Sequence, residues 1–216
     1  MKQLSVLYIQ SLDGADPKLA NEILDDSGAR ASIDALNWAP EYNYKPITIF
    51  NVGRSSDSIF IKYNVHGSMI KAIYSKDQSP VYKDSCVEFF CRLPDSDHYF
   101  NFEFNCIGTC HAAKRKGRDE DVQPFSLEDL SLIKRYSSLG KRVFKEMEGM
   151  FEWDLTVKIP FSLIGIDPQN LPSHIFANFN KCADDTDSPH YVTWNPIVSE
   201  HPDFHHPEYF GKLLFI

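Results

Sequence analysis

The sequence predicts an all-β fold: a two-sheet antiparallel β-sandwich of immunoglobulin or jelly-roll type with short helical insertions. Many short segments alternate β-branched or aromatic residues with polar ones, which is the pattern of half-buried strands. Turn-forming residues separate these segments at the spacing of hairpins. Many short strands with few helices indicate two packed sheets in one domain.

The strand pattern begins after residue 46 and continues to the end of the chain. Breaks are expected at residues 53–56, Gly67, 75–80, 94–97 and Gly149, where glycine, proline, serine or aspartate gather. The expected strands are residues 47–52, 58–66, 68–74, 85–92, 99–110, 142–147, 150–159, 175–182 and 209–216.

Two short helices are expected. Asp16 can cap a helix that has Pro17 in its first turn and ends at Gly28. A second helix start lies at residues 126–129, within the long connection between residues 109 and 140. We expect one sandwich domain over residues 36–216, preceded by an extension, residues 1–35, that packs on it.

Composition excludes several classes of partner. The formal net charge is -8, which disfavours nucleic acid and anionic membranes because phosphate binding needs clustered lysine and arginine. The basic run at residues 114–118 leads directly into acidic residues 119–121, so we expect a solvated loop there. No segment reaches the roughly 20 apolar residues of a membrane span, and the chain as written shows no export signal. We therefore expect a cytoplasmic location, or a periplasmic or extracellular one if the true start lies elsewhere.

The chain has five cysteines, an odd number, and no CxxC pair that would suggest a zinc or redox site. We expect buried free thiols. The sequence does not determine whether the protein binds a metal ion.

A pair of glutamates is the most informative feature. Residues 84–91 and 99–109 predict an antiparallel hairpin closed by the turn at 94–97. Glu88 and Glu103 would then lie about 5 Å apart at Cβ on one face, where like charges repel. A proton, a metal ion, a basic side chain or ligand hydroxyls could compensate. The alternative is two solvated acids on an open face.

Two loop regions carry further candidates. Trp194 follows the loop at residues 184–190, where a tryptophan can stack on a ligand or pack internally. Residues 200–208 hold His201, His205 and His206, which could bind a metal. Because two prolines impose an extended path, the imidazoles need not converge. A loop that presents Phe204 and His205 at the rim of the sandwich is favoured.

Taken in order, several blocks resemble family 9 carbohydrate-binding modules of the wider DOMON-like group, over roughly residues 34–216. The resemblance implies an antiparallel sandwich that holds terminal sugars of glucans or xylans between two aromatic rings. It also implies polar side chains on the intervening strands and, in some members, structural calcium; no other cofactor is expected. The blocks are residues 84–90, 105–109, 153–162, the strand around Asn178, and 207–213.

Transferred residue by residue, the resemblance places Tyr82 at the first ring and Phe204 at the second. Glu88 matches the family's sugar-binding glutamate, whereas Glu103 stands where such modules can offer arginine. Asn180 matches a polar strand residue that faces the ligand. The expected ligand-binding residues are Tyr82, Glu88, Glu103, Asn105, Asn180, Trp194, Phe204 and His205.

The favoured function is non-catalytic binding of the ends of glucan- or xylan-type oligosaccharides or polysaccharides in polysaccharide utilisation. One alternative is a glycoside hydrolase, because paired carboxylates about 5 Å apart suit a retaining mechanism. Another is a DOMON-type redox or interaction module, in which Met69 with His66 or His111 would be the loose candidates for haem ligands.

Overall fold

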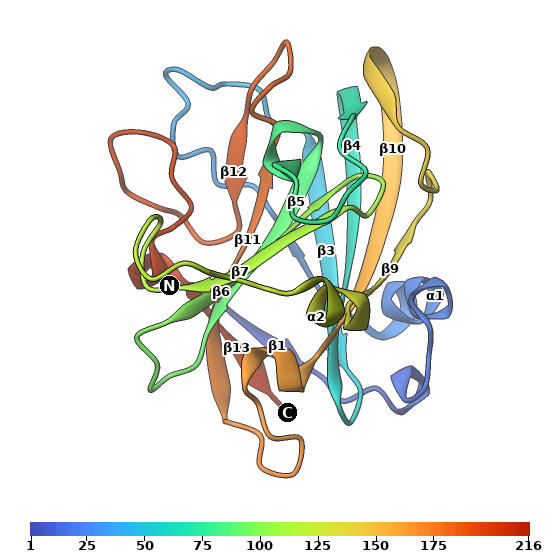
Figure 1. Cartoon of the computed structure of the whole chain (residues 1–216), viewed down its shortest axis with the longest axis vertical. Helices are drawn as coiled ribbons and strands as arrows, with labels where there is room; N and C mark the ends of the chain where they lie inside the picture. Colours follow the sequence, from blue (N-terminus) through green and yellow to red (C-terminus); the bar gives the residue numbers. More distant parts are fainter.

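A computed structural model describes residues 1–216 as two β-sheets packed face to face (Figure 1), which confirms the predicted sandwich. Two α-helices, α1 (Pro17–Ser27) and α2 (Leu127–Leu132), lie outside the two layers. Single 3-10 turns span Gln10–Leu12, Val81–Lys83, Phe161–Ile164 and Pro207–Tyr209. The strands are β1 (Gln3–Val6), β2 (Ala29–Ser32), β3 (Ile47–Arg54), β4 (Ser58–Ala72), β5 (Cys86–Arg92), β6 (Tyr99–Asn105), β7 (Cys110–Arg115), β8 (Gln123–Pro124), β9 (Lys134–Ser137), β10 (Phe144–Pro160), β11 (His174–Cys182), β12 (Tyr191–Thr193) and β13 (Gly211–Phe215).

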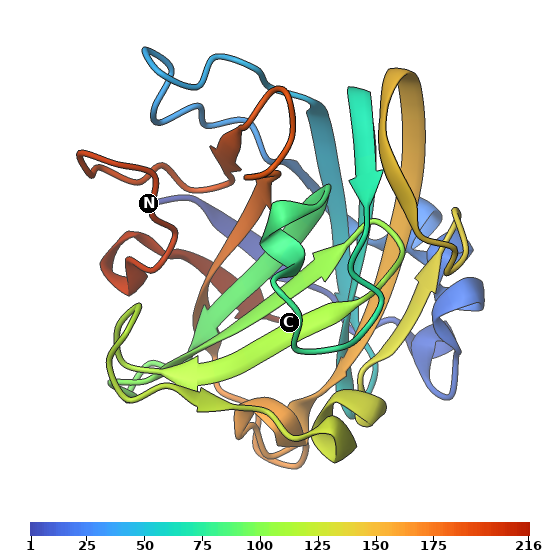
Figure 2. The same cartoon turned by 45° about the horizontal axis from the view of Figure 1, so that its top comes forward.

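The larger sheet has eight strands in the order β1-β13-β11-β5-β6-β7-β8, and β12 pairs with the second half of β11. The smaller sheet has five strands in the order β2-β3-β4-β10-β9. Figure 2 shows the strands of the larger sheet in front of those of the smaller one. All pairs between neighbouring strands are antiparallel except β1–β13, which is parallel and brings the two ends of the chain together.

The main core fills the space between the sheets and is rich in aromatic rings. Phe50 of the smaller sheet stacks on Phe179 of the larger one, with ring centroids 3.8 Å apart. Phe89 and Phe102 extend this aromatic layer across β5 and β6. Side chains alternate along a strand, so the residues next to these phenylalanines on β5, β6 and β11 point to the outer face of the larger sheet.

Residues 1–35 complete both sheets. They supply β1 to the edge of the larger sheet and β2 to the edge of the smaller one. Helix α1 begins at the predicted cap, where the Asp16 carboxylate accepts a hydrogen bond from the Leu19 N–H. Its buried face packs Ala20 and Leu24 against Phe60, on the outer side of the smaller sheet.

Two predicted breaks in the smaller sheet were wrong. The two strands expected around Gly67, residues 58–66 and 68–74, are one continuous strand, β4, which ends at Ala72, because its partner β10 pairs with it along nearly its whole length. Residues 142–159, expected as two strands around Gly149, form β10. Its ladder shifts register between Glu148 and Phe151, and this irregularity accommodates the positive φ of Gly149.

One predicted strand is in fact two. Residues 99–110 reverse direction after Asn105, so that Cys110 lies opposite Phe104 on the next strand, β7. Gly108 makes this reversal with φ +82°, a conformation that residues with a Cβ rarely adopt. All five cysteines are buried free thiols, as expected.

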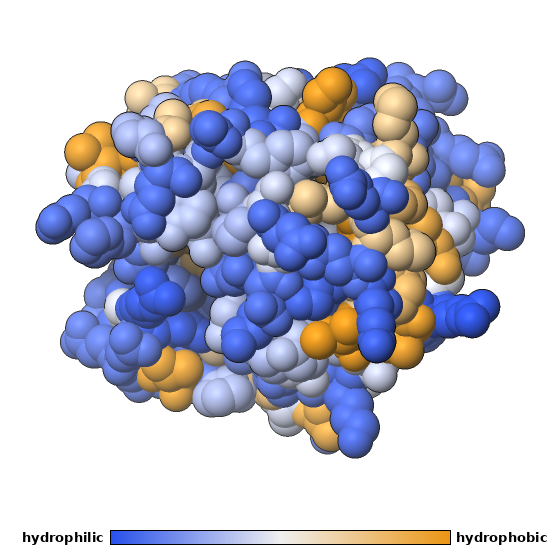
Figure 3. Space-filling view, turned by 90° about the horizontal axis from the view of Figure 1, so that it is seen from above, coloured by the Kyte–Doolittle hydropathy of each residue, from blue (hydrophilic) through white to orange (hydrophobic).

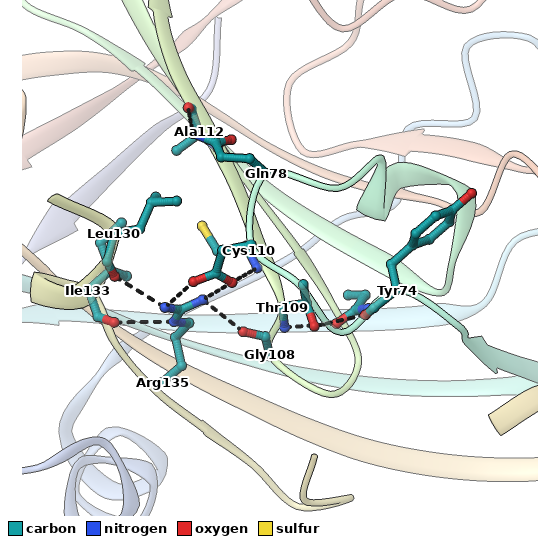
Figure 4. Close-up of polar contacts among 11 residues, drawn as sticks. Tyr74, Gln78, Gly108, Thr109, Cys110, Ala112, Leu130, Ile133 and Arg135 are labelled. Atoms are coloured by element: carbon teal, nitrogen blue, oxygen red, sulfur yellow. Dashed lines mark hydrogen bonds and ion pairs between the residues drawn. The ribbon is translucent and has the colours of Figure 1, made fainter. Parts of the chain in front are cut away.

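A polar network fixes the connection between β4 and β5 (Figure 4). Tyr82 lies in the second half of this connection. Arg135 of β9 binds both carboxylate oxygens of Asp77, at 2.8 and 2.9 Å, and also donates to the carbonyls of Gly108 and Leu130. Burial alone would raise the pKa of Asp77, but the hydrogen bonds from Arg135 and from the Cys110 N–H outweigh it and lower that pKa. The Gln78 side chain adds hydrogen bonds to both backbone groups of Ala112.

The end of the molecule seen in Figure 3 is mostly hydrophilic, and hydrophobic residues gather on the side where β4 and β10 end. Met150 of β10 is 99% exposed. Neither α-helix has the length and apolar character needed to cross a membrane.

We expect Phe102→Ala to lower the free energy of unfolding by about 3 to 5 kcal/mol, because Phe102 is fully buried in the aromatic layer. Met150→Ala, at an exposed position, should change it by no more than about 0.5 kcal/mol. Urea denaturation measures both. A loss below about 1 kcal/mol for Phe102→Ala would contradict the assignment of the core face.

We expect Arg135→Gln to lower the free energy of unfolding by about 1 to 3 kcal/mol, because it leaves the partly buried Asp77 carboxylate without its bidentate partner. Lys134→Gln, one residue earlier and exposed, is the matched control and should have almost no effect. Equal unfolding curves for the two variants would show that this network does not stabilise the fold.

Candidate functional site

A pocket of about 300 Å³ lies on the outer face of the larger sheet. Its floor is made by side chains of four neighbouring strands: Cys182 of β11, Glu88 of β5, Glu103 of β6 and His111 of β7. Its rim comes from four loops. The rim residues are Tyr82 in the β4–β5 connection, Arg118 and Asp119 after β7, Asp184 and Tyr191 around the β11–β12 loop, and Pro202 to His205 before β13.

The strand register aligns three floor residues, Glu88, Glu103 and His111, in one row with Asn180 of β11. Glu88 lies directly opposite Glu103, as the sequence predicted. On the outer flanks, Asn180 lies opposite Glu88, and His111 lies opposite Glu103. The row therefore crosses four strands with no apolar side chain between its members.

Both glutamates are buried rather than solvated: Glu88 is 3% exposed and Glu103 is 5% exposed. The Asn180 amide donates to Glu88 Oε2 at 3.2 Å, and the Cys182 thiol donates to Glu88 Oε1 at 3.3 Å. The Asn101 amide donates to Glu103 Oε1 at 2.9 Å. The interpretation as two solvated acids on an open face is therefore wrong.

Burial raises the pKa of three acids at the pocket. It raises the pKa of Glu88 well above its ordinary value, and the charge of Glu103 adds to this effect. It raises the pKa of Glu103 to about 7, although Arg115 opposes the shift. It raises the pKa of Asp184 to about 6, again with a contribution from Glu103. Each shift has the sign expected for an acid without a close cation.

Two arginines of the pocket were missed by the sequence interpretation, which placed residues 114–118 in a solvated loop. Strand β7 in fact extends to Arg115, which is 8% exposed and lines the pocket. Its Nη1 donates to the carbonyl of Arg118 at 2.6 Å. Arg118 in turn lies 3.5 Å from Asp203. The alternation of residues along β7, after the turn at Gly108, was the sequence signal that could have placed Arg115 in a strand.

The expected rim residues do line the pocket. Tyr82 is 37% exposed, so its ring is accessible to a ligand. Phe204 is mostly buried and packs its ring on Trp38 and Tyr191. His205 accepts or donates a hydrogen bond with the Tyr99 hydroxyl at 2.8 Å, and burial lowers its pKa to about 3, so its imidazole is neutral.

Two expected site residues lie elsewhere. Trp194 is 3% exposed and packs on Phe50 and Phe179 between the sheets, because β12 turns its ring inward; this corrects the expectation that it stacks on a ligand. Asn105 is fully buried and joins the backbone carbonyl of Tyr74 to the N–H of Thr109. Its amide therefore supports the β6–β7 turn and does not line the pocket.

The chain leaves seven buried side-chain polar atoms without a hydrogen-bond partner, and five of them belong to residues in or beside the pocket. Such atoms are rare in folded proteins and call for an explanation, commonly a ligand or water. They are Asn180 Oδ1, Glu103 Oε2, Asn101 Oδ1, His111 Nδ1 and Arg115 Nε.

One group of three side chains has the spacing of metal ligands: Cys86, Glu88 and Cys182, whose ligand atoms lie within 4.8 Å of one another. Calcium takes oxygen ligands, so a set with two thiols does not fit the structural calcium that the resemblance implied. Burial raises the pKa of Cys86 to about 12 and that of Cys182 well above its ordinary value, so both thiols are neutral.

The histidines named for metal or haem binding are dispersed. His66 and Met69 lie on β4 of the smaller sheet, with His66 beside Glu152, whereas His111 lies in the pocket of the larger sheet, so Met69 and His111 lie on different sheets. In the loop before β13, His205 contacts Tyr99 and His206 contacts Glu208.

Comparisons with known proteins agree with this geometry. The profile of carbohydrate-binding family 9 matches residues 18–215. A protein of Bacteroides uniformis, described provisionally as carbohydrate-binding, is 32% identical and superposes with a TM-score of 0.91. The match covers 100% of this chain and 99% of the Bacteroides chain.

Two structures of a family 9 module from Caldicellulosiruptor kristjanssonii share the fold. The complex with glucose is 11% identical with a TM-score of 0.62, covering 100% of this chain and 96% of the module. The complex with cellotriose is 12% identical with a TM-score of 0.64, covering 99% and 93%. No curated protein matched the chain.

The raised pKa of Glu103 predicts a loss of stability as the pH rises. Its pKa is about 7 in the folded protein against an ordinary value of 4.5, so the folded state binds the proton more tightly. This contribution is fully present below about pH 4.5 and is lost as the pH rises through 7. When the pH is raised from 5 to 8, the free energy of unfolding of the parent protein should therefore fall by on the order of 2 kcal/mol more than that of Glu103→Gln.

Urea denaturation at both pH values measures this difference. Glu152→Gln, on the exposed face of the smaller sheet, is the control and should follow the parent protein. Parallel losses in the parent and Glu103→Gln would mean that Glu103 is not a buried acid with a raised pKa.

Proposed function

The chain belongs to carbohydrate-binding family 9, and we propose that it binds the terminal residues of glucan- or xylan-type oligosaccharides in this pocket without catalysing a reaction. The observation that supports this proposal most strongly is the group of five unpartnered buried polar atoms around the pocket. Sugar hydroxyls donate and accept hydrogen bonds, so they can satisfy both kinds of atom.

The pocket has a polarity that suits a sugar ring. On the side of β11, β5 and β6, Asn180, Glu88 and Glu103 offer oxygen acceptors. On the β7 side, Arg115 offers a guanidinium donor whose Nε has no partner. A ring lying between them can donate hydroxyl protons to the acids and accept from the arginine. The hydrogen bond from the charged guanidinium is stronger than a neutral one.

Aromatic residues of the rim supply the apolar contact. Tyr82 and Tyr191 line the same pocket, and their loops are joined because the Asp184 N–H donates to the Tyr82 carbonyl at 3.0 Å. Tyrosine rings with one accessible face can stack on the C–H face of a sugar. Phe204 lies behind Tyr191 and supports it.

The placement of the carboxylates favours binding over hydrolysis. In glycoside hydrolases the two acids flank the scissile bond. Here Glu88 and Glu103 lie side by side on the floor of one sheet, so both would meet the same face of a bound sugar. A retaining mechanism would also need one acid ionised, whereas burial raises the pKa of each.

We expect Glu88→Gln to weaken the binding of cellotriose or xylotriose by about 0.5 to 1.5 kcal/mol, because it replaces the hydrogen-bonding carboxyl group at the pocket floor by an amide. Tyr82→Ala should weaken binding separately, by about 0.5 to 1.5 kcal/mol, through loss of the stacking surface. Isothermal titration calorimetry measures both, and thermal unfolding checks that the variants are folded.

Glu152→Gln, on the other sheet, is the matched control and should bind like the parent protein. If both pocket variants bound as tightly as the parent, the sugar site would lie elsewhere. Release of reducing sugar from either trisaccharide by the parent, abolished in Glu88→Gln, would replace the binding proposal by a hydrolase.

A further inference from the structure

The acids of the pocket outnumber its cations. Glu88, Glu103, Asp119, Asp184 and Asp203 line it, against two arginines. Arg118 is engaged with Asp203 at 3.5 Å. His205 is neutral, and burial together with Arg115 lowers the pKa of His111, so neither imidazole adds a positive charge near neutral pH. The ligand pocket thus has an excess of negative or proton-bearing groups.

Three of these acids form one electrostatic group at the inner end of the pocket. The charge of Glu103 contributes to the raised pKa of both Glu88 and Asp184, and Asp184 contributes to that of Glu88. The acids come from β5, from β6 and from the loop that follows β11. Arg115, from β7, lowers the pKa of Glu103 yet leaves it at about 7. Without a ligand, protons must therefore compensate the charge of this group.

The hydrogen bonds around this group leave mainly acceptors free, and the unpartnered donor of the pocket, Arg115 Nε, lies on β7. Asn180 and Asn101 direct their amide N–H groups at Glu88 and Glu103, so their carbonyl oxygens have no partner. Glu103 Oε2 has no partner either. The Cys182 thiol is directed at Glu88 as well. A ligand group that fits here brings several donors and a positive charge.

We propose that the sugar residue bound in this pocket carries an ammonium group, as in a glucosamine residue of a β-linked glucan-type chain. This inference rests on the proposed function and names the class of its ligand. An ammonium has three N–H donors and one positive charge, so it can serve Glu103, Glu88 and a neighbouring amide oxygen together. A hydroxyl supplies one donor and no charge, and an N-acetyl group supplies one N–H and an added acceptor.

Proton release distinguishes this ligand from a neutral sugar. An ammonium stabilises the ionised carboxylates, so acids that hold protons in the free protein lose them on binding. At pH 6.5, Glu103, with a pKa of about 7, is largely protonated in the free protein. Affinity for the amino sugar should therefore rise between pH 5.5 and pH 7, whereas affinity for a neutral sugar should not.

The experiment is calorimetric titration of the full chain at pH 6.5 with three trisaccharides: the glucosamine trimer, cellotriose and the N-acetylglucosamine trimer. Two buffers with different ionisation enthalpies report the protons exchanged. We expect the glucosamine trimer to bind at least about tenfold more tightly than cellotriose, which corresponds to about 1.4 kcal/mol, with net proton release. Cellotriose and the N-acetylated trimer should release none.

The matched variants are Glu103→Gln and Glu152→Gln. Glu103→Gln should bring the ratio of the glucosamine and cellotriose affinities toward one, whatever its effect on either affinity alone. Glu152→Gln, on the other sheet, should leave the ratio unchanged. A parent protein that binds cellotriose as tightly as the glucosamine trimer, or that binds the latter without proton release, would overturn the inference and leave the proposed function intact. Failure of all three sugars to bind would overturn the proposed function itself.

Discussion

The pairing of Glu88 with Glu103 across β5 and β6 determines the chemistry of the molecule. Phenylalanines on the inner face of the same hairpin, Phe89 and Phe102, lock this register, since a slip of one residue would expose the aromatic layer and bury the acids in the core. The fold therefore holds two like charges side by side in a buried place. The costs of desolvation and repulsion are reduced when the acids keep protons, and a ligand that supplies donors can take over that role.

The rest of the pocket is arranged around this pair. The amide donors of Asn180 and Asn101 support the carboxyl groups, while Arg115 lies on β7 opposite Tyr99 and lines the same pocket. The Tyr82 turn and the β11–β12 loop meet through two backbone hydrogen bonds, and the Asp77–Arg135 network anchors the connection that leads into Tyr82. Stability of the rim thus depends on residues far from any ligand.

The sandwich, the hairpin and the shared face of the glutamates could be predicted because alternation and turn residues are local signals. The β6–β7 reversal could not, since residues 106–109 continue the strand pattern and only tertiary pairing reveals the turn at Gly108. Missing that turn also hid Arg115, whose sequence neighbours suggested a solvated loop. Trp194 was misplaced for a related reason: a short strand such as β12 gives no alternation long enough to tell its inner face from its outer one.

The central claim is that the buried glutamate pair is the floor of a sugar site. NMR of protein with carbon-13-labelled glutamate carboxyls tests it directly, by following each resonance as an oligosaccharide is added. The account predicts that the Glu88 and Glu103 carboxyl signals shift with a common saturation curve, while that of Glu152 on the other sheet stays fixed. Saturable binding with no change at Glu88 or Glu103 would contradict it.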